Sequence, residues 1–397
     1  MIKILLSSLL ALSIITLSFF EQSWVTFWSF LSIPPMNPPG FFDYKAIIFS
    51  LESYKDGFNP YIQNPNNFQE GLFMYPKIWL YMAEYFNLEN KNIYYFSIFL
   101  FLTVYFNIYF KITKLIDDKF FRYSVIIIFL STSNFLVIER MNIEIIIFIL
   151  IFFSISVKNN FLQIFLFSLA VIGKIFPIFI IAASLDSIKK FILLTVISLI
   201  IIFFSYDNIV SFSINFIDWS TVFAYGSKTL SRSFFNLFNE IGYNFTDKEY
   251  RLIVYFFVSM SLFLSLALIL LGYKLTKKSV KNYDFSFNLK DKLFMAGSSI
   301  YLGTFIIGSN VDYRLIFFVY LLPYLSSIKD KIYKFTFFSL IIISANSFYF
   351  NLSDPFSLNY MINGFIIHSI KIVLMFMISF EVGSLISKKN LLKIYKF

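Results

Sequence analysis

The sequence predicts an all-α, polytopic transmembrane protein, and its composition carries most of that prediction. Of the 397 residues, 58% are hydrophobic and only 14% are charged, and the mean hydropathy is +0.74. In a water-soluble domain roughly a quarter of the residues are charged, and a disordered chain contains far less apolar surface. The apolar residues form continuous runs that suit a bilayer core about 30 Å thick. Such runs are expected to be helical, because a helix satisfies its own backbone hydrogen bonds in lipid.

We expect one integral-membrane domain over residues 1–397, with about 11 to 13 spans. The expected spans lie near residues 4–20, 72–86, 93–113, 123–138, 143–157, 161–183, 189–206, 250–273, 293–308, 314–328, 334–350 and 361–387. The first run follows Lys3, but no small-x-small cleavage site follows Phe20. This favours a retained span over a cleaved signal peptide.

Basic residues predict the orientation, because Lys and Arg concentrate in cytoplasmic loops. The segments 274–292 and 329–334 and the tail from Lys388 are basic, whereas 351–360 carries no basic residue. We therefore expect the three basic segments in the cytoplasm. The net charge of +10 is explained by these loops, so the expected surroundings are membrane lipids and no nucleic acid.

The same alternation makes 21–71 and 207–249 outer-face loops and places the N-terminus inside. One segment disagrees, since 111–122 carries four basic residues yet faces outward by this count. Either its neighbouring acids weaken the rule there, or 72–86 lies along the membrane surface and another segment is re-entrant.

Several kinds of chemistry are excluded by missing residues. The chain has no cysteine and a single histidine, His368, which excludes disulfides, thiolate nucleophiles and the usual His/Cys metal sites. We expect no metal and no cofactor, and we interpret His368 as a packed core residue. The sequence contains no phosphate-binding glycine loop, serine elbow or zinc-protease helix. No loop is long enough for a nucleotide-binding domain, which favours a substrate carried by lipid.

The first outer loop contains the most conspicuous candidate acid. Seven of the ten prolines lie between Pro34 and Pro76, and proline forbids continued helix, so an ordered loop is expected there. Asp43 follows this loop between Phe42 and Tyr44. A carboxylate in a partly dry, aromatic setting is suited to act as a general base on a sugar hydroxyl. The alternative is an acid that caps the following helix.

Four cations are candidates for binding phosphate or for ion pairing. Lys174 lies mid-span beside Pro177, where it either meets a lipid phosphate or pairs with an acid. Arg232 and Arg314 are expected on the outer side, where a guanidinium can grip a phosphate in two places. The alternative for Arg314 is an ion pair with Asp312. For Arg140 we favour an ion pair with Glu139 or Glu144.

Seven short segments, in this order, resemble the GT-C superfamily of integral-membrane glycosyltransferases, and most closely the polyprenol-phosphate-mannose-dependent alpha-mannosyltransferase-like family (GT87). The matching segments are Phe42–Tyr44, Gly57–Tyr61, Tyr75-Pro76, Glu139–Asn142, Gly173–Pro177, Ser231–Asn236 and Asp312–Arg314. The family often has a glycine where this chain has Met141. The resemblance implies that Asp43 is the functional acid, with Lys174, Arg232 and Arg314 around the donor phosphate.

The resemblance also implies an activity in the cell membrane, with the active site on the outer side. A hexose, with mannose the expected one, would pass from a polyprenyl-phosphate sugar donor to a lipid-linked or cell-envelope glycan acceptor. The expected substrate-binding residues are Tyr44, Asn59, Tyr61, Tyr75, Arg140, Asn142, Asn236, Asp312 and Tyr313. The three tyrosines of the first loop are candidates for stacking on sugar rings.

Two other functions remain open at this point. A polymerase or ligase of lipid-linked oligosaccharides would place its essential groups in 207–249 and leave Asp43 dispensable. A transporter or lipid flippase would favour inverted repeats with paired broken helices. The sequence has a helix break near Pro177 but no matching break elsewhere.

Overall fold

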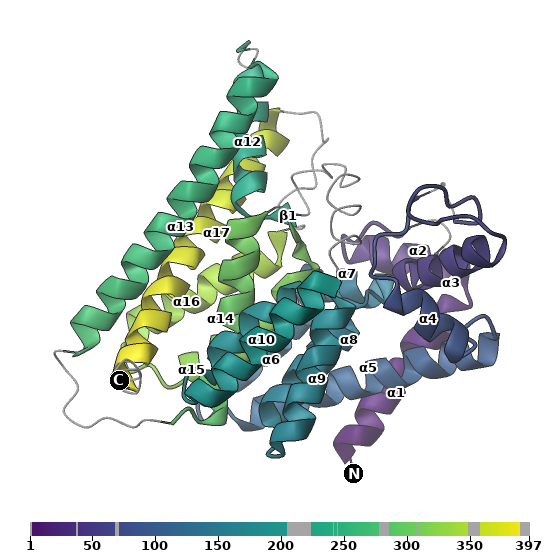
Figure 1. The fold of residues 1–397 in the computed structure, drawn as a ribbon, viewed down its shortest axis with the longest axis horizontal. Coiled ribbons are helices and arrows are strands. Elements are labelled where there is room, and N and C mark those ends of the chain that lie inside the picture. Colours follow the sequence, from purple (N-terminus) through teal and green to yellow (C-terminus); the bar gives the residue numbers. More distant parts are fainter. Residues whose placement is uncertain are drawn as a thin grey trace. The chain divides into compact units, whose positions relative to one another are not determined.

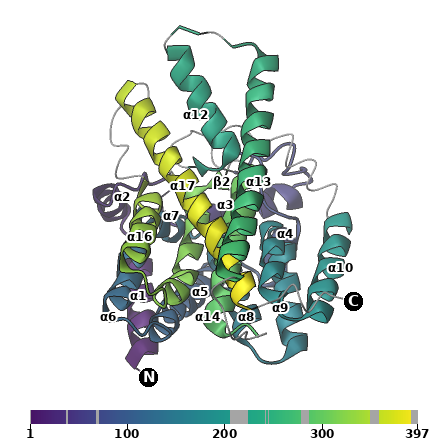
Figure 2. The same ribbon diagram turned by 90° about the vertical axis from the view of Figure 1, so that its left-hand side faces the viewer.

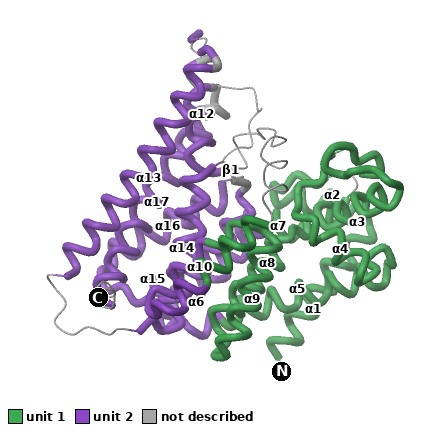
Figure 3. Tube along the Cα trace, viewed as in Figure 1, with its two compact units in different colours: residues 1–111, 135–178, 194–218 green, residues 112–134, 179–193, 219–397 purple. Residues whose placement is uncertain are grey.

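The computed structural model describes residues 2–36, 39–67, 71–204, 224–240, 242–243, 245–277, 286–308, 310–347 and 358–389. Over these ranges the chain is almost entirely helical (Figure 1). It divides into two compact units (Figure 3). Unit 1 comprises residues 1–111, 135–178 and 194–218, and unit 2 comprises 112–134, 179–193 and 219–397.

Unit 1 contains the amino-terminal helices and the elements that surround the first outer loop. They are α1 (Ile2–Ser18), α2 (Glu21–Phe30), α3 (Phe42–Lys55), α4 (Ile78–Tyr85), α5 (Lys91–Lys114), α7 (Thr132–Arg140), α8 (Glu144–Ser156) and α9 (Asn160–Gly173). The 3-10 helix η2 (Phe176–Ser184) and α10 (Ile188–Phe204) run through both units, as do the ends of α5 and α7. Between α2 and α3 the described prolines lie in irregular backbone, as expected.

Unit 2 contains the carboxy-terminal half of the chain. Its elements are α6 (Lys119–Phe129), β1 (Ala224–Tyr225), α12 (Ser227–Glu240), α13 (Asp247–Lys277), α14 (Leu289–Ile307), β2 (Asn310–Val311), the 3-10 helix η4 (Asp312–Tyr320), α15 (Leu322–Leu325), α16 (Lys331–Ala345) and α17 (Leu358–Lys388). The two short strands pair antiparallel, with Ala224 opposite Val311.

Three helices are long and apolar enough to cross a membrane: Lys91–Lys114, Lys248–Lys277 and Ile362–Lys388. Two bent pairs raise the number to five if each pair is one span, namely α1 with α2 at 117° and α6 with α7 at 45°. These helices support a polytopic membrane protein among the described residues.

The two longest helices of unit 2, α13 and α17, lie side by side (Figures 1 and 2). They meet at glycines: a Cβ atom on Gly272 would lie 2.1 Å from the Phe380 oxygen, and one on Gly383 would lie 1.9 Å from the Ile269 oxygen. Small residues let membrane helices approach closely. On α13, large apolar side chains such as Phe263, 70% exposed, are available to lipid.

Three of the expected spans are short or broken in the structure. Within 72–86 the only helix is α4, whose 8 residues extend about 12 Å. The run 161–183 divides at Lys174, whose backbone is extended (φ −157, ψ 147), and continues in η2, where Pro177 is the second residue. The run 314–328 divides into η4 and α15, which has Pro323 in its first turn. Proline causes such breaks because it lacks an N–H and clashes with the preceding turn.

Ion pairs within unit 2 locate the segment 111–122. Asp117 pairs with Lys290 at 2.8 Å and Asp118 pairs with Lys334 at 3.1 Å. Lys290 and Lys334 belong to the segments predicted to be cytoplasmic. Asp117 and Asp118 therefore lie on the same side of unit 2 as those segments, whereas the span count places 111–122 opposite them.

The helices of unit 1 show which predicted span before α5 is too short to cross a membrane. In unit 1, Lys111 lies over the Phe153 ring at 5.2 Å, so the end of α5 adjoins the end of α8. Lys174 pairs with Glu144 at the other end of α8, and in unit 2 Asp186 pairs with Lys292 at 3.2 Å. Within unit 1, α9 therefore runs antiparallel to α8. The 8 residues of α4 are too few to cross a bilayer core of about 30 Å, which supports the alternative in which 72–86 is not a span.

Candidate functional site

Asp43 lies in the first turn of α3, and this helix begins directly after a left-handed residue. The residue before the helix, Phe41, has φ 58 and ψ 42, and no side chain caps the helix there. The alternative in which Asp43 serves as the capping residue is therefore wrong. The carboxylate instead accepts a hydrogen bond from the Asn142 side chain, with 2.5 Å between Oδ2 and Nδ2.

Asn142 connects the acid to the rest of the site. It follows α7 and the left-handed Met141 (φ 47), and its side chain is buried. Its Nδ2 also lies 3.2 Å from the Tyr75 hydroxyl, and its Oδ1 accepts from the Glu144 backbone N–H at 3.0 Å. A single buried amide thus orders three neighbours, which is a positioning role as much as a substrate-binding one.

Lys174 reaches the same group from the end of α9. Its Nζ lies 2.7 Å from Glu144 Oε1 and 5.3 Å from the centre of the Tyr75 ring. The side chain of Lys174 is 15% exposed and that of Glu144 is 2% exposed. The interpretation of Lys174 as an ion-pair partner is therefore confirmed. We call Asp43, Tyr75, Asn142, Glu144 and Lys174 the Asp43 cluster.

The helix end that carries Lys174 is fixed by α4. Trp79 Nε1 donates to the Gly173 carbonyl oxygen at 2.9 Å. A Cβ atom on Gly173 would lie 3.0 Å from Ile147 Cδ1 and 3.1 Å from Trp79 Cζ2. A larger residue would push these neighbours apart, so the glycine allows α4, α8 and α9 to meet beside the cluster.

The other predicted residues of the first loop, Asn59, Tyr61 and Tyr44, form hydrogen bonds within unit 1. The Asn59 side-chain oxygen accepts from the Tyr61 backbone N–H at 3.1 Å, and the Tyr61 hydroxyl donates to the Tyr75 carbonyl at 2.8 Å. Tyr44 is buried, with its hydroxyl 2.9 Å from Ser97 Oγ and its ring against Tyr94. Burial raises the pKa of Tyr44 to about 12, and the Ser97 hydrogen bond opposes that shift.

Arg140 is an ion-pair partner, as we favoured. Its Nε donates to Glu139 Oε2 at 2.8 Å, and its Nη2 donates to the Pro34 carbonyl at 3.2 Å. Sequence reasoning treated Glu139 and Glu144 only as partners for Arg140 and assigned neither to the site. The available signal was a pair of acids flanking the break between two apolar helices.

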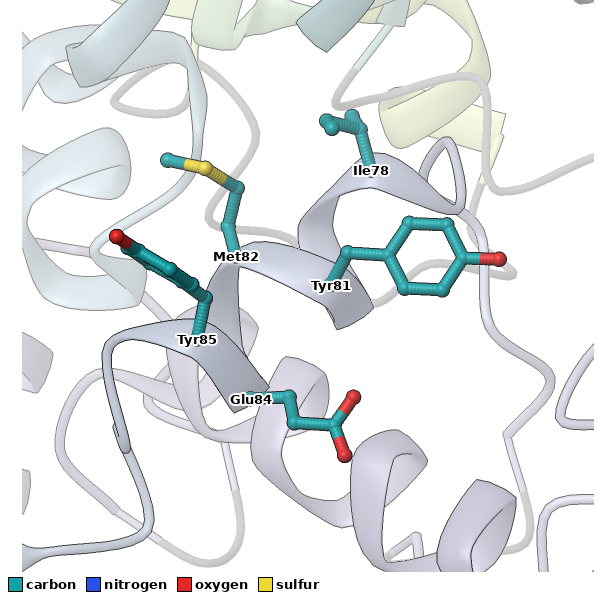
Figure 4. A pocket seen from close by; sticks show the side chains of 5 residues that line it. All are labelled: Ile78, Tyr81, Met82, Glu84 and Tyr85. Carbon is teal, nitrogen blue, oxygen red and sulfur yellow. The ribbon is translucent and has the colours of Figure 1, made fainter.

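A hollow lies on the exposed side of α4. It is lined by Ile78, Tyr81, Met82, Glu84 and Tyr85 (Figure 4). Tyr85 is 83% exposed, and the hollow begins three residues after Tyr75 in the chain. Its lining is mainly apolar and aromatic, which suits a hydrocarbon chain.

The other predicted residues lie in unit 2. Arg232 lies on α12, which follows β1, and Arg314 lies on η4, which follows β2. Because the two strands pair antiparallel, α12 and η4 leave the strand pair at opposite ends. Tyr313 lies on η4 beside Arg314, and Asn236 lies on α12 with its side chain outside the described part of the structure.

Asp312 has a partner that the sequence did not indicate. Its carboxylate lies 2.9 Å and 3.1 Å from Lys371 Nζ and accepts a hydrogen bond from Ser347. His368, one turn before Lys371 on α17, is buried, in agreement with its interpretation as a core residue.

The chain matches no family model, no curated protein and no solved structure. Within the described ranges, no group of three or more His, Cys, Asp or Glu side chains could hold a metal ion. What the site can do is therefore argued from its own residues. The structure brings four predicted residues together in unit 1 (Asp43, Tyr75, Asn142 and Lys174). Arg232 and Arg314 lie in unit 2, on the segments that follow the two paired strands.

Proposed function

We propose that the protein is a GT-C-like membrane glycosyltransferase that moves a hexose from a polyprenyl-phosphate donor to a lipid-linked or glycan acceptor. The observation that carries this proposal is the convergence of Asp43, Tyr75, Asn142 and Lys174. They come from four separate segments of the chain, and the sequence predicts each of them as a site residue. A carboxylate and an ammonium held in one partly exposed cluster suit the deprotonation of a hydroxyl next to an anionic group.

In this reaction Asp43 accepts the proton of the acceptor hydroxyl as that oxygen attacks the sugar's anomeric carbon. The bond from that carbon to the phosphate oxygen breaks, and the phosphate leaves with the electron pair. The hydrogen bond from Asn142 orients the carboxylate for proton transfer, and a positioned base typically contributes about 10²–10⁴-fold to the rate.

Cations would stabilise the charge that develops on the leaving phosphate. Lys174 is held in place by Glu144, and its ammonium has three donors. Arg232 and Arg314 belong to unit 2 and carry planar guanidinium groups of the kind that bind phosphate well. The apolar hollow on α4 offers a place for the isoprenoid chain of the donor.

The expected outer-face position of the site rests on the alternation of basic segments, which makes 21–71, the loop that carries Asp43, an outer-face loop. We propose that the shorter apolar helices join the candidate spans in a multi-pass arrangement of about 11 to 13 segments in the cell membrane.

Transfer of label from polyprenyl-phosphate mannose, and from its glucose analogue, tests the proposal in membranes containing the full chain. We expect transfer by the wild type and a loss of about 10²-fold or more in D43N. The matched control is E89Q, which removes an exposed acid of unit 1 paired with Lys55 and is expected to transfer normally.

Equal transfer by D43N and the wild type would exclude Asp43 as the base. If substitutions in 207–249 abolished activity while Asp43 was dispensable, a lipid-linked oligosaccharide polymerase or ligase would be favoured. Solute uptake or lipid scrambling by liposomes, without a sugar product, would favour a transporter or flippase.

A further inference from the structure

Two buried residues with left-handed backbone lie next to the Asp43–Asn142 hydrogen bond. Phe41 (φ 58) comes two residues before Asp43, and Met141 (φ 47) comes directly before Asn142. Bulky residues rarely adopt this conformation, and it persists only where the surroundings hold it. The question is which group holds these two turns.

Glu139 contacts the Phe41 turn and lies close in sequence to the Met141 turn. Its backbone carbonyl accepts from the Phe41 N–H at 3.0 Å, and it lies two residues before Met141. Its fully buried carboxylate accepts from Trp24 Nε1 at 3.2 Å and from Arg140 Nε at 2.8 Å. The Trp24 ring in turn packs edge-on against Phe41, with 5.1 Å between the centroids.

The proline loop before Asp43 is held by two cations close to the same carboxylate. Arg140 Nη2 donates to the Pro34 carbonyl at 3.2 Å, and Lys45 Nζ donates to the Pro39 carbonyl at 2.7 Å. Burial lowers the pKa of Lys45, and the charges of Glu139 and Glu21 oppose that shift. Glu139 is therefore ion-paired with Arg140, which holds Pro34, and its charge also favours the protonated form of Lys45, which holds Pro39.

We propose that Glu139 is a positioning residue, whose buried carboxylate keeps the Phe41 turn and the proline loop in the conformation that presents Asp43 to the acceptor. A buried ion pair adds little net stability over a well-packed apolar residue, so packing alone does not explain a carboxylate here. The inference rests on the proposed function only for the role of Asp43 as base.

The absence of cysteine from the sequence allows a direct test in the full chain. The D43C variant, in lipid nanodiscs, carries one thiol whose alkylation rate by N-ethylmaleimide reports the accessibility of that turn. We expect D43C/E139Q to react about tenfold faster, which corresponds to about 1.4 kcal/mol. D43C/W24F should show a smaller increase, because it removes only the indole hydrogen bond and keeps an aromatic ring against Phe41.

A kinetic measurement separates positioning from binding. In the sugar-transfer assay, E139Q is expected to lower kcat about tenfold, because one hydrogen bond to a charged group is lost. KM should stay within about twofold of the wild-type value, because Glu139 is fully buried and is not expected to contact the substrate. E89Q, in the same unit, should leave the kinetics and the alkylation rate unchanged.

Equal alkylation rates of D43C and D43C/E139Q would overturn the proposal, even if E139Q lowered the melting temperature. That combination would assign Glu139 a purely structural role. If the wild type transferred no sugar from polyprenyl-phosphate donors, the proposed function would fail, yet the alkylation comparison would still decide whether Glu139 positions residue 43.

Discussion

Each unit contains an ion pair in its interior, and the two pairs differ in how far water reaches them. The Lys174–Glu144 pair of unit 1 keeps its lysine side chain 15% exposed, whereas the side chains of the Asp312–Lys371 pair of unit 2 are both 0% exposed. A partly accessible cation can meet a ligand, while a fully enclosed pair can act only on the protein around it. The Lys174–Glu144 pair, which we call the open pair, is therefore suited to meet a ligand. The Asp312–Lys371 pair, which we call the closed pair, is suited to hold segments of the protein together.

The closed pair anchors the segment that carries Arg314. Lys371 belongs to α17, and its carbonyl accepts from the Tyr301 hydroxyl at 2.8 Å. The Tyr301 ring is stacked on Tyr225 of β1, with 5.5 Å between the centroids. Charges within membrane spans are costly and are usually paired. Here the pair joins the start of η4 to α17, next to the strand pair.

Breaking the closed pair should have the largest effect. D312N or K371M alone leaves one buried charge without its partner, and we expect a loss of about 3–5 kcal/mol of stability. D312N/K371M removes both charges and should lose less. Thermal unfolding and the yield of monodisperse protein in detergent measure this. Single variants as stable as the double variant would contradict the assignment of a closed pair.

Breaking the open pair should cost less stability but more function. E144Q removes the partner of Lys174, and we expect a loss of up to about 3 kcal/mol, because water can solvate part of the lysine. K174M leaves the carboxylate of Glu144, which is 2% exposed, without its partner, so it should cost more stability than E144Q and, in addition, raise KM for the donor. Melting temperatures and transfer kinetics measure the two effects. A KM for K174M equal to that of the wild type would remove Lys174 from the phosphate site.

Tyr44 provides a pH test confined to unit 1. Burial raises its pKa in the folded state from 10.0 to about 12, so its contribution to stability is complete below pH 10 and is lost as the pH rises towards 12. Two pKa units correspond to at most about 2.7 kcal/mol. We expect the stability of Y44F to fall less steeply than that of the wild type over this range. The free energy of unfolding of both proteins, measured between about pH 8 and about pH 11.5, tests this prediction. The same pH dependence in both would mean that the Tyr44 hydroxyl is exposed to water.

The smallest expected effect is at Gly57, in the turn after α3. Its φ is +89, and nothing lies within 4 Å of the position that a Cβ atom would take. G57A therefore costs only the backbone strain, about 1 kcal/mol. The matched variant G383A should cost more, because a backbone oxygen lies 1.9 Å from its Cβ position. Equal melting temperatures for the two would argue against close packing of α13 and α17.

Sequence reasoning found much of the candidate site because its residues break the pattern around them. Asp43 follows a run of prolines, Asn142 separates two apolar runs, and Lys174 interrupts a third. Each is visible as a polar residue where the neighbours predict membrane. Glu139 was visible too, but its contact with the Phe41 turn joins residues 41 and 139, and no local pattern reports such a contact.

The sequence by itself determined that this chain is apolar enough for a membrane, which segments are apolar, and which segments are basic. These properties follow from composition and local order, since transfer free energy adds up residue by residue. Only the tertiary structure decided that the run 161–183 breaks at Lys174, that Asp312 pairs with Lys371, and that Asp43 and Lys174 belong to one cluster. Each of these depends on contacts between segments distant in the chain, where the burial of a charge is tolerated only beside a specific partner.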